Sequence, residues 1–139
     1  MKIYFAASIR GGRDDINLYI DLINFLKQHG EVLTEQVADA MISEAGEQDL
    51  SVETIYERDM EWMKEADIVI AEVSTPSLGV GYEIGKAEEM NKPIVCMYRV
   101  IADKVLSAMV AGNKNVKLIK YRELPELVMQ LKDILKEHE

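Results

Sequence analysis

Residues 67–98 read DIVIAEVSTPSLGVGYEIGKAEEMNKPIVCMY. The run of apolar and β-branched residues over 67–73 predicts a buried strand. Pro76 and the glycines after it favour a loop, which leads into a helix expected over 81–90. A second apolar run over 93–98 predicts another strand. A strand, a helix and a strand in succession are typical of two parallel strands joined by a crossover helix.

The same alternation continues toward both ends of the chain. Further strands are predicted over 2–7, 32–33 and 116–119, and further helices over 14–29, 51–65, 103–110 and from Pro125 onward, with a weaker helical pattern over 36–46. Strands that alternate with helices predict a parallel sheet covered on both faces. We therefore expect an α/β protein with a flavodoxin-like three-layer α/β/α fold, whose five-stranded parallel sheet has the order 2-1-3-4-5.

The charge of the chain bears on which partners are expected. Its formal net charge is −9 at pH 7 over 139 residues. Because phosphate backbones select for basic surfaces, neither a nucleic acid polymer nor an anionic membrane is expected as a partner. One phosphate group can still bind at a single locally positive site.

Cysteine and histidine are scarce, which bears on disulfides, metals and location. The chain has a single cysteine, Cys96, so no intrachain disulfide is expected. Its two histidines, His29 and His138, lack the spacing of zinc ligands, so no metal is expected. Neither a signal peptide nor an apolar run long enough to span a bilayer is recognisable. These observations favour a cytoplasmic protein.

Ligands of such sheets bind at the carboxyl ends of the strands, where the winding direction switches. In the expected order this point lies between the first and third strands, so residues 8–13 and 74–83 should meet there. The first segment reads SIRGGR and precedes a helix. Glycines allow a ligand close to the backbone, and the free amides of a helix N-terminus favour an anion. The same residues also suit an ordinary turn with a helix cap.

The second segment reads SLGVGYEIG over 77–85. Ser77 offers a hydroxyl and Gly79 allows a tight passage from strand to helix. Glu83 shares a helix face with apolar residues such as Ala87, so its carboxylate points at protein or ligand. An acid in the first turn can also serve only as a partner of the helix dipole.

A second acid interrupts an apolar helix face. Asp59 lies between Ile55 and Trp62 in the helix expected over 51–65. Acidic residues are seldom buried unless they are paired or functional, although this one could also lie at the edge of the stripe and reach solvent. Two inward carboxylates beside a phosphate pocket are typical of the pair that cleaves glycosidic bonds.

Five short motifs in order resemble a known family. They are SIRGGR (8–13), LTE (33–35), DMEW (59–62), SLGVGYEIG (77–85) and LSAM (106–109). Together they closely resemble the 2'-deoxynucleoside 5'-phosphate N-hydrolases, which belong to the nucleoside 2-deoxyribosyltransferase superfamily. The likeness runs over nearly the whole chain and implies a single nucleoside deoxyribosyltransferase-like domain over 1–139.

The resemblance implies hydrolysis of the N-glycosidic bond of a 2'-deoxynucleoside 5'-monophosphate, giving free base and 2-deoxyribose 5-phosphate without a cofactor. By analogy, Glu83 is the nucleophile and forms a covalent deoxyribosyl intermediate. Asp59 would assist the leaving base or orient the sugar, and Tyr4 would lie near the sugar and Glu83.

The resemblance also implies how the substrate is bound. Ser8, the amides after it, Ser77 and Gly79 would hold the 5'-phosphate, and Ser107 would reach it from the second subunit of a homodimer. With the rest of the first segment and the LSAM motif, the predicted binding residues are Ser8, Ile9, Arg10, Gly11, Gly12, Arg13, Ser77, Gly79, Ser107, Ala108 and Met109.

Three other functions stay open at this point. A deoxyribosyltransferase would share the nucleophile and pass the sugar to another base. An N-hydrolase of ribonucleotides such as cytidine monophosphate would differ in the space beside Tyr4. A non-catalytic nucleotide-binding domain would not need both Asp59 and Glu83. Gln36 follows the LTE motif where animal members of the family carry histidine, so the base preference is open as well.

Overall fold

The computed structural model describes residues 1–8, 13–35, 50–101 and 103–139. Five parallel strands form one sheet in the order β2-β1-β3-β4-β5, as predicted. Their bounds are Lys2–Ala7 (β1), Glu31–Val32 (β2), Ile68–Glu72 (β3), Ile94–Arg99 (β4) and Val116–Tyr121 (β5). All five carboxyl ends therefore lie along the same edge of the sheet.

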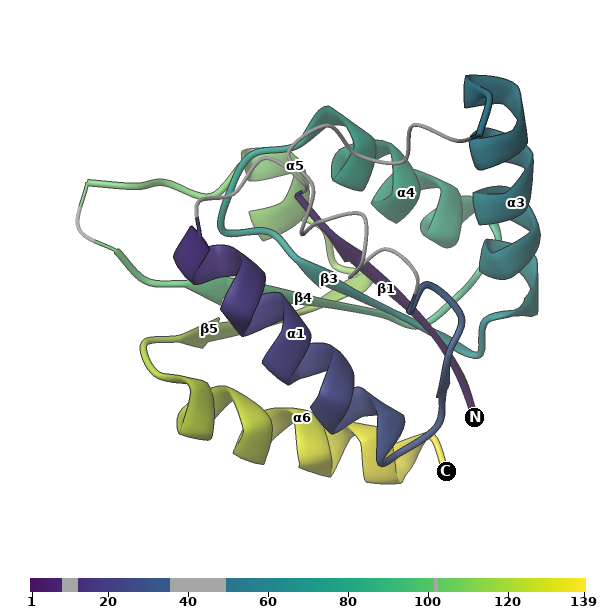
Figure 1. The fold of residues 1–139 in the computed structure, drawn as a ribbon. Helices are drawn as coiled ribbons and strands as arrows, with labels where there is room; N and C mark the ends of the chain where they lie inside the picture. The colour runs from purple at the N-terminus through teal and green to yellow at the C-terminus, as the bar shows by residue number, and fades with distance from the viewer. Residues whose placement is uncertain (9–12, 36–49, 102) are drawn as a thin grey trace.

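Helices cover both faces of the sheet (Figure 1). Their bounds are Arg13–Lys27 (α1), Val52–Glu65 (α3), Leu78–Glu89 (α4), Ala108–Ala111 (α5) and Leu124–Glu137 (α6). α1 and α6 pack on one face, and α3 and α4 on the other. This confirms the flavodoxin-like three-layer arrangement. The weak helix expected over 36–46 lies outside the described residues.

The central strand β3 divides the core in two because its side chains alternate between the faces. Ile68 and Ile70 pack with α1 and α6, whereas Val69 and Ala71 pack with α3 and α4. A strand covered on both faces reads as a continuous apolar run, which is the pattern that predicted it.

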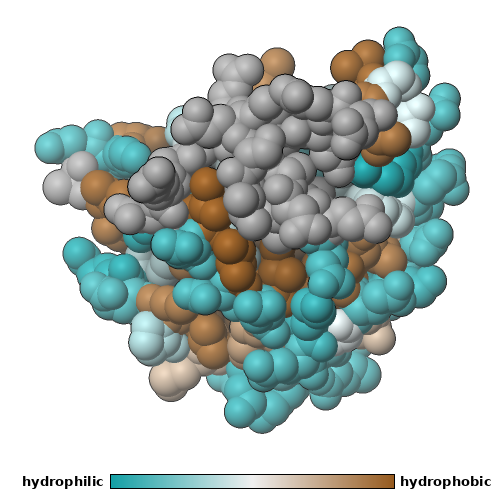
Figure 2. Space-filling model, viewed as in Figure 1, coloured by the Kyte–Doolittle hydropathy of each residue, from teal (hydrophilic) through white to brown (hydrophobic). Residues whose placement is uncertain are grey.

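The outer side of α6 is mainly hydrophilic (Figure 2). Within the described ranges, no helix is both long and apolar enough to cross a membrane.

Two helices begin three or more residues away from the expected start. α4 begins at Leu78 rather than Gly81, because the Ser77 hydroxyl accepts a hydrogen bond from the Val80 amide at 3.3 Å and caps the helix. The helix expected over 103–110 is wrong in its start: α5 begins only at Ala108 and has four residues.

Two local features accompany the late start of α5. Asp103 has a φ of 67°, which lies outside the helical region. Ser107 then acts as the N-cap, with its hydroxyl accepting from the Met109 amide at 3.3 Å. The cap predicted at Ser51, by contrast, is confirmed, since its side chain accepts from the Thr54 amide at 3.1 Å.

The packing of α6 yields a test of the core. Leu131 is 0% exposed, whereas Met129 on the same helix is 71% exposed. We expect Leu131→Ala to lower the free energy of unfolding by about 2–5 kcal/mol, because it removes buried surface and leaves a cavity. Met129→Ala should change it by no more than about 0.5 kcal/mol. Urea denaturation followed by circular dichroism measures both, and equal losses would contradict this packing.

Candidate active site

The two segments expected to meet begin at the carboxyl ends of adjacent strands. β1 and β3 pair in parallel up to Ala7↔Glu72. Ser8 follows β1 directly and is buried, and Ser77 caps α4 after the loop that leaves β3. Ile9, Arg10, Gly11 and Gly12 lie outside the described residues. Arg13 is the first residue of α1.

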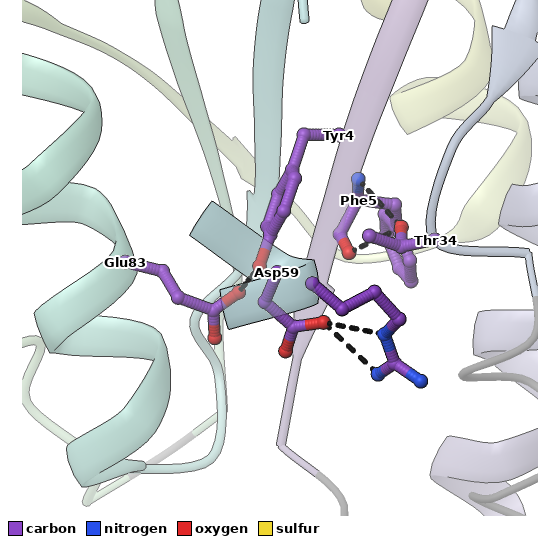
Figure 3. A network of polar contacts seen from close by, with 6 residues as sticks. Tyr4, Phe5, Thr34, Asp59 and Glu83 are labelled. Carbon is purple, nitrogen blue, oxygen red and sulfur yellow. Dashed lines mark hydrogen bonds and ion pairs between the residues drawn. The ribbon is translucent and has the colours of Figure 1, made fainter. Parts of the chain in front are cut away.

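A tyrosine and a glutamate join β1 to α4. The Tyr4 side chain lies on the α3–α4 face of the sheet, and its hydroxyl donates a short hydrogen bond to Glu83 Oε2 (Figure 3). Glu83 stands in the second turn of α4 and is half-buried. The structure therefore brings together two residues that are 79 positions apart in sequence.

The surroundings of Glu83 shift its acidity. Burial raises the pKa of the Glu83 carboxyl to about 7, the Tyr4 hydrogen bond opposes that shift, and the negative charge of Asp59 adds to it. Burial and the Glu83 charge also raise the pKa of the Tyr4 phenol, so the phenol stays protonated and donates. Glu83 is thus a carboxyl group that changes charge near neutral pH.

Asp59 lies beside this pair and is held by an arginine. Arg58 donates to Asp59 Oδ1 from Nε at 3.1 Å and from Nη2 at 2.9 Å, the bonds dashed in Figure 3. The same guanidinium lies 4.5 Å from the centre of the Trp62 ring. The nearby positive charge stabilises the ionised form of Asp59. Figure 3 shows that Asp59 lies next to Tyr4 and Glu83, as expected from the sequence.

The backbone at Gly79, in the first turn of α4, is not crowded by neighbouring atoms. A Cβ at Gly79 would meet nothing closer than Ser77 Oγ at 3.9 Å. The helix that starts here has 12 residues, so its first amides carry a positive dipole end. This end suits an anion. Among the described residues, no group of three or more histidine, cysteine, aspartate or glutamate side chains is placed to hold a metal ion.

Residues of the LSAM motif line a cavity away from Tyr4, Asp59 and Glu83. Ser107 and Met109 line a cavity of about 1060 Å³ between α4 and the segment around α5, together with Ser77 and Leu78. Tyr4, Asp59 and Glu83 are not among its lining residues. Within one chain, Ser107 is therefore not brought to the carboxylate pair.

Two contacts near the site were not expected from the sequence. The short β2 pairs with β1 only as far as Ile3, and the Thr34 side chain of the LTE motif takes over this pairing at Phe5. Its hydroxyl donates to the Phe5 carbonyl at 2.8 Å and accepts from the Phe5 amide at 3.0 Å (Figure 3). Arg58 was not singled out either, although a cation next to an inward acid is a signal that could have found it.

The chain is similar in sequence to known proteins. A family model described as nucleoside 2-deoxyribosyltransferase matches residues 3–119. The 5-hydroxymethyl-dUMP N-hydrolase of Danio rerio is 43% identical over 138 residues, which cover 99% of this chain and 95% of that protein. The protein of the same name from Mus musculus is 50% identical over 112 residues, which cover 80% of this chain but only 65% of the mouse protein.

A solved structure shares the fold. The Clostridium botulinum CMP N-glycosidase BcmB superposes with a TM-score of 0.69 at 24% identity, covering 95% of this chain and 99% of that one. The span matched by the family model runs from β1 into β5 and contains Tyr4, Asp59 and Glu83, so the chain belongs to the nucleoside 2-deoxyribosyltransferase family.

Proposed function

We propose that this protein hydrolyses the N-glycosidic bond of 2'-deoxynucleoside 5'-monophosphates, releasing the free base and 2-deoxyribose 5-phosphate. The observation that carries the proposal is the half-buried Glu83 carboxyl, which accepts a hydrogen bond from Tyr4 and lies beside Asp59. Relatives that match nearly the full length of the chain and are named 5-hydroxymethyl-dUMP N-hydrolase support it.

The proposed chemistry is a double displacement at the anomeric carbon. Ionised Glu83 attacks C1' while the bond to the base nitrogen breaks, and the base leaves with the bonding electrons and takes up a proton. Water then attacks C1' of the deoxyribosyl ester and restores the carboxylate. A 2-deoxy sugar lacks an electron-withdrawing hydroxyl beside C1', so an oxocarbenium-like transition state forms more readily.

The arginine partner of Asp59 bears on which of two roles this acid takes. Arg58 donates two hydrogen bonds to Oδ1 and favours the ionised carboxylate. An ionised Asp59 accepts hydrogen bonds, so it suits orientation of a sugar hydroxyl better than protonation of the departing base.

The 5'-phosphate is proposed to bind between Ser77 at the α4 N-terminus and Ser8 at the carboxyl end of β1. The contacts expected of Ile9, Arg10, Gly11 and Gly12 stay predictions from the sequence. Helix amides and hydroxyls donate to phosphate oxygens without a metal. A phosphate held there would place C1' over Glu83, and fixed orientation of this kind lowers the barrier.

A homodimer is proposed to complete the site. Leu78 and Val105 are each 94% exposed and Met109 is 83% exposed, all beside the cavity lined by Ser107. Exposed apolar residues grouped in this way are typical of a surface that another protein covers. A second copy packed here would bury them and bring its Ser107 toward the phosphate. A cytoplasmic location and a single domain over 1–139 stay predictions from the sequence.

The proposed reaction is tested with a panel of substrates. Deoxynucleoside monophosphates, deoxynucleosides and ribonucleotides are incubated with the protein, with and without an acceptor base, and the free and newly glycosylated bases are measured by chromatography. We expect free base from deoxynucleoside monophosphates, with an activity that Glu83→Gln lowers by about 10³-fold or more, because the nucleophile is lost.

The control is Glu137→Gln, an exposed acid at the end of α6 on the other face of the sheet, whose loss should leave turnover unchanged. No base release from any deoxynucleotide would overturn the proposed reaction. Sugar transfer in place of hydrolysis would make the protein a transferase, and release from cytidine monophosphate alone would make it a ribonucleotide hydrolase.

The pH dependence tests the nucleophile. Because Glu83 has a pKa raised to about 7 and must be ionised to attack, kcat/KM should rise with pH through about 7 and fall about tenfold per unit below it. Tyr4→Phe removes a donor that favours the ionised form. It should therefore raise the pKa of Glu83 and move the acidic limb upward by about one unit.

Tyr82→Phe is the matched control, since the Tyr82 hydroxyl pairs with Tyr56 rather than Glu83. The substrate phosphate titrates near pH 6, but it does so equally for both variants. An acidic limb that Tyr4→Phe does not move would contradict the role given to this hydrogen bond.

Subunit mixing tests the shared site. Glu83→Gln and Ser107→Ala should each be impaired alone, whereas an equal mixture after subunit exchange should recover about a quarter of the wild-type activity. Half of the dimers are then mixed, and each mixed dimer has one intact site. Activity that never exceeds the mean of the two variants would contradict a Ser107 contributed by the partner, and a protein that sediments only as a monomer would exclude the dimer.

A further inference from the structure

A second polar cluster lies on the opposite face of the sheet from Glu83. Glu72 ends β3, is 1% exposed and faces α1 and α6, as Ile70 does two residues earlier. Its Oε1 accepts from the Ser74 amide at 2.7 Å and its Oε2 accepts from the Tyr121 hydroxyl at 2.5 Å. This buried acid thus fixes the first turn of the chain after β3.

The cluster extends from Ser74 to the first helix through Arg99. The Arg99 amide donates to Ser74 Oγ at 2.8 Å, and its Nη2 donates to Asp15 Oδ1 at 2.9 Å. Asp15 lies in the first turn of α1. Thr75 Oγ1 lies 3.5 Å from Asp15 Oδ2, too long for a strong hydrogen bond. The ends of β3, β4 and β5 and the start of α1 are therefore linked in one network.

This network reaches two elements that border the proposed phosphate site. Asp15 lies in the first turn of α1, two residues after the segment 8–13 ends, and Ser74 begins the loop that leads to Ser77. We propose that Asp15 and Arg99 are positioning residues for phosphate binding, which hold the start of α1 and the loop 73–77 in register with each other. This inference rests on the proposed function.

The physical reason is that the two segments come from different elements. The donors of a phosphate site must be in place together before binding, or binding must order them at an entropic cost. The Asp15–Arg99 ion pair is shielded, with side chains 17% and 30% exposed, so solvent screens it less than it screens an exposed pair. Neither residue is proposed to touch the substrate.

The test measures phosphate binding apart from chemistry in Asp15→Asn, Arg99→Met and the double variant. With 2'-deoxyuridine 5'-monophosphate as substrate, KM should rise about tenfold in each single variant while kcat stays within about twofold. The inhibition constant of inorganic phosphate as a competitor should rise by the same factor. The double variant should be no worse than the more affected single one, since both changes break the same link.

Lys27→Met is the matched control, because it breaks an exposed ion pair with Glu35 near the other end of α1. It should leave KM and the phosphate inhibition constant unchanged. Unchanged values in Asp15→Asn and Arg99→Met, or a fall of kcat that follows the melting temperature without any change in phosphate inhibition, would overturn the inference and leave the proposed function standing. A wild-type protein that hydrolyses no deoxynucleotide would overturn both.

Discussion

The hydrogen bond from the Tyr4 hydroxyl to the Glu83 carboxylate joins the inner strand β1 to α4 across one face of the sheet. Neighbours of Glu83 along the helix, Val80, Ile84 and Ala87, are buried against that face, so the carboxyl lies where an apolar side chain would otherwise pack. Placing a charge there is unfavourable unless a donor meets it. The donor comes from the sheet, and the sheet therefore sets both the position and the acidity of the group.

Alternation along β3 explains why Glu72 lies on the other face of the sheet from Tyr4 and Glu83. The strand interior is apolar on each face, and its last residue, Glu72, continues the series that faces α1 and α6. The opposite face carries Tyr4 and Glu83. Burial raises the pKa of Glu72, as it does that of Glu83, but the partners of Glu72 are an amide and a phenol of the framework. The buried Glu72 and the half-buried Glu83 thus have unlike surroundings on the two faces of the sheet.

Much of the fold followed from local patterns. Apolar runs of four to seven residues predicted β1, β3 and β4, and their alternation with helices predicted the strand order. The start of α5 did not follow, because neither the positive φ at Asp103 nor the helix cap at Ser107 is marked by the apolar pattern. The family assignment is confirmed by the comparisons.

The site was predictable only in part. Glu83 and Asp59 stood out because each interrupts an apolar helix face, and the structure places them side by side. Their catalytic roles stay predictions. Arg58 adjoins Asp59 in the sequence and could have been chosen for that reason. The Asp15–Arg99 pair could not, because the sequence offers 16 basic and 25 acidic residues and no measure of which distant ones approach each other.

Ser77 illustrates how one side chain can serve a helix and a ligand together. Its oxygen accepts from the Val80 amide through a lone pair, which leaves the hydroxyl hydrogen available to a phosphate oxygen. Aspartate is an equally good cap, yet it has no hydrogen to offer and would repel the anion. A serine at this position therefore both caps the helix and offers a donor to an anion. An acidic replacement would keep the helix cap but prevent the binding of phosphorylated sugars.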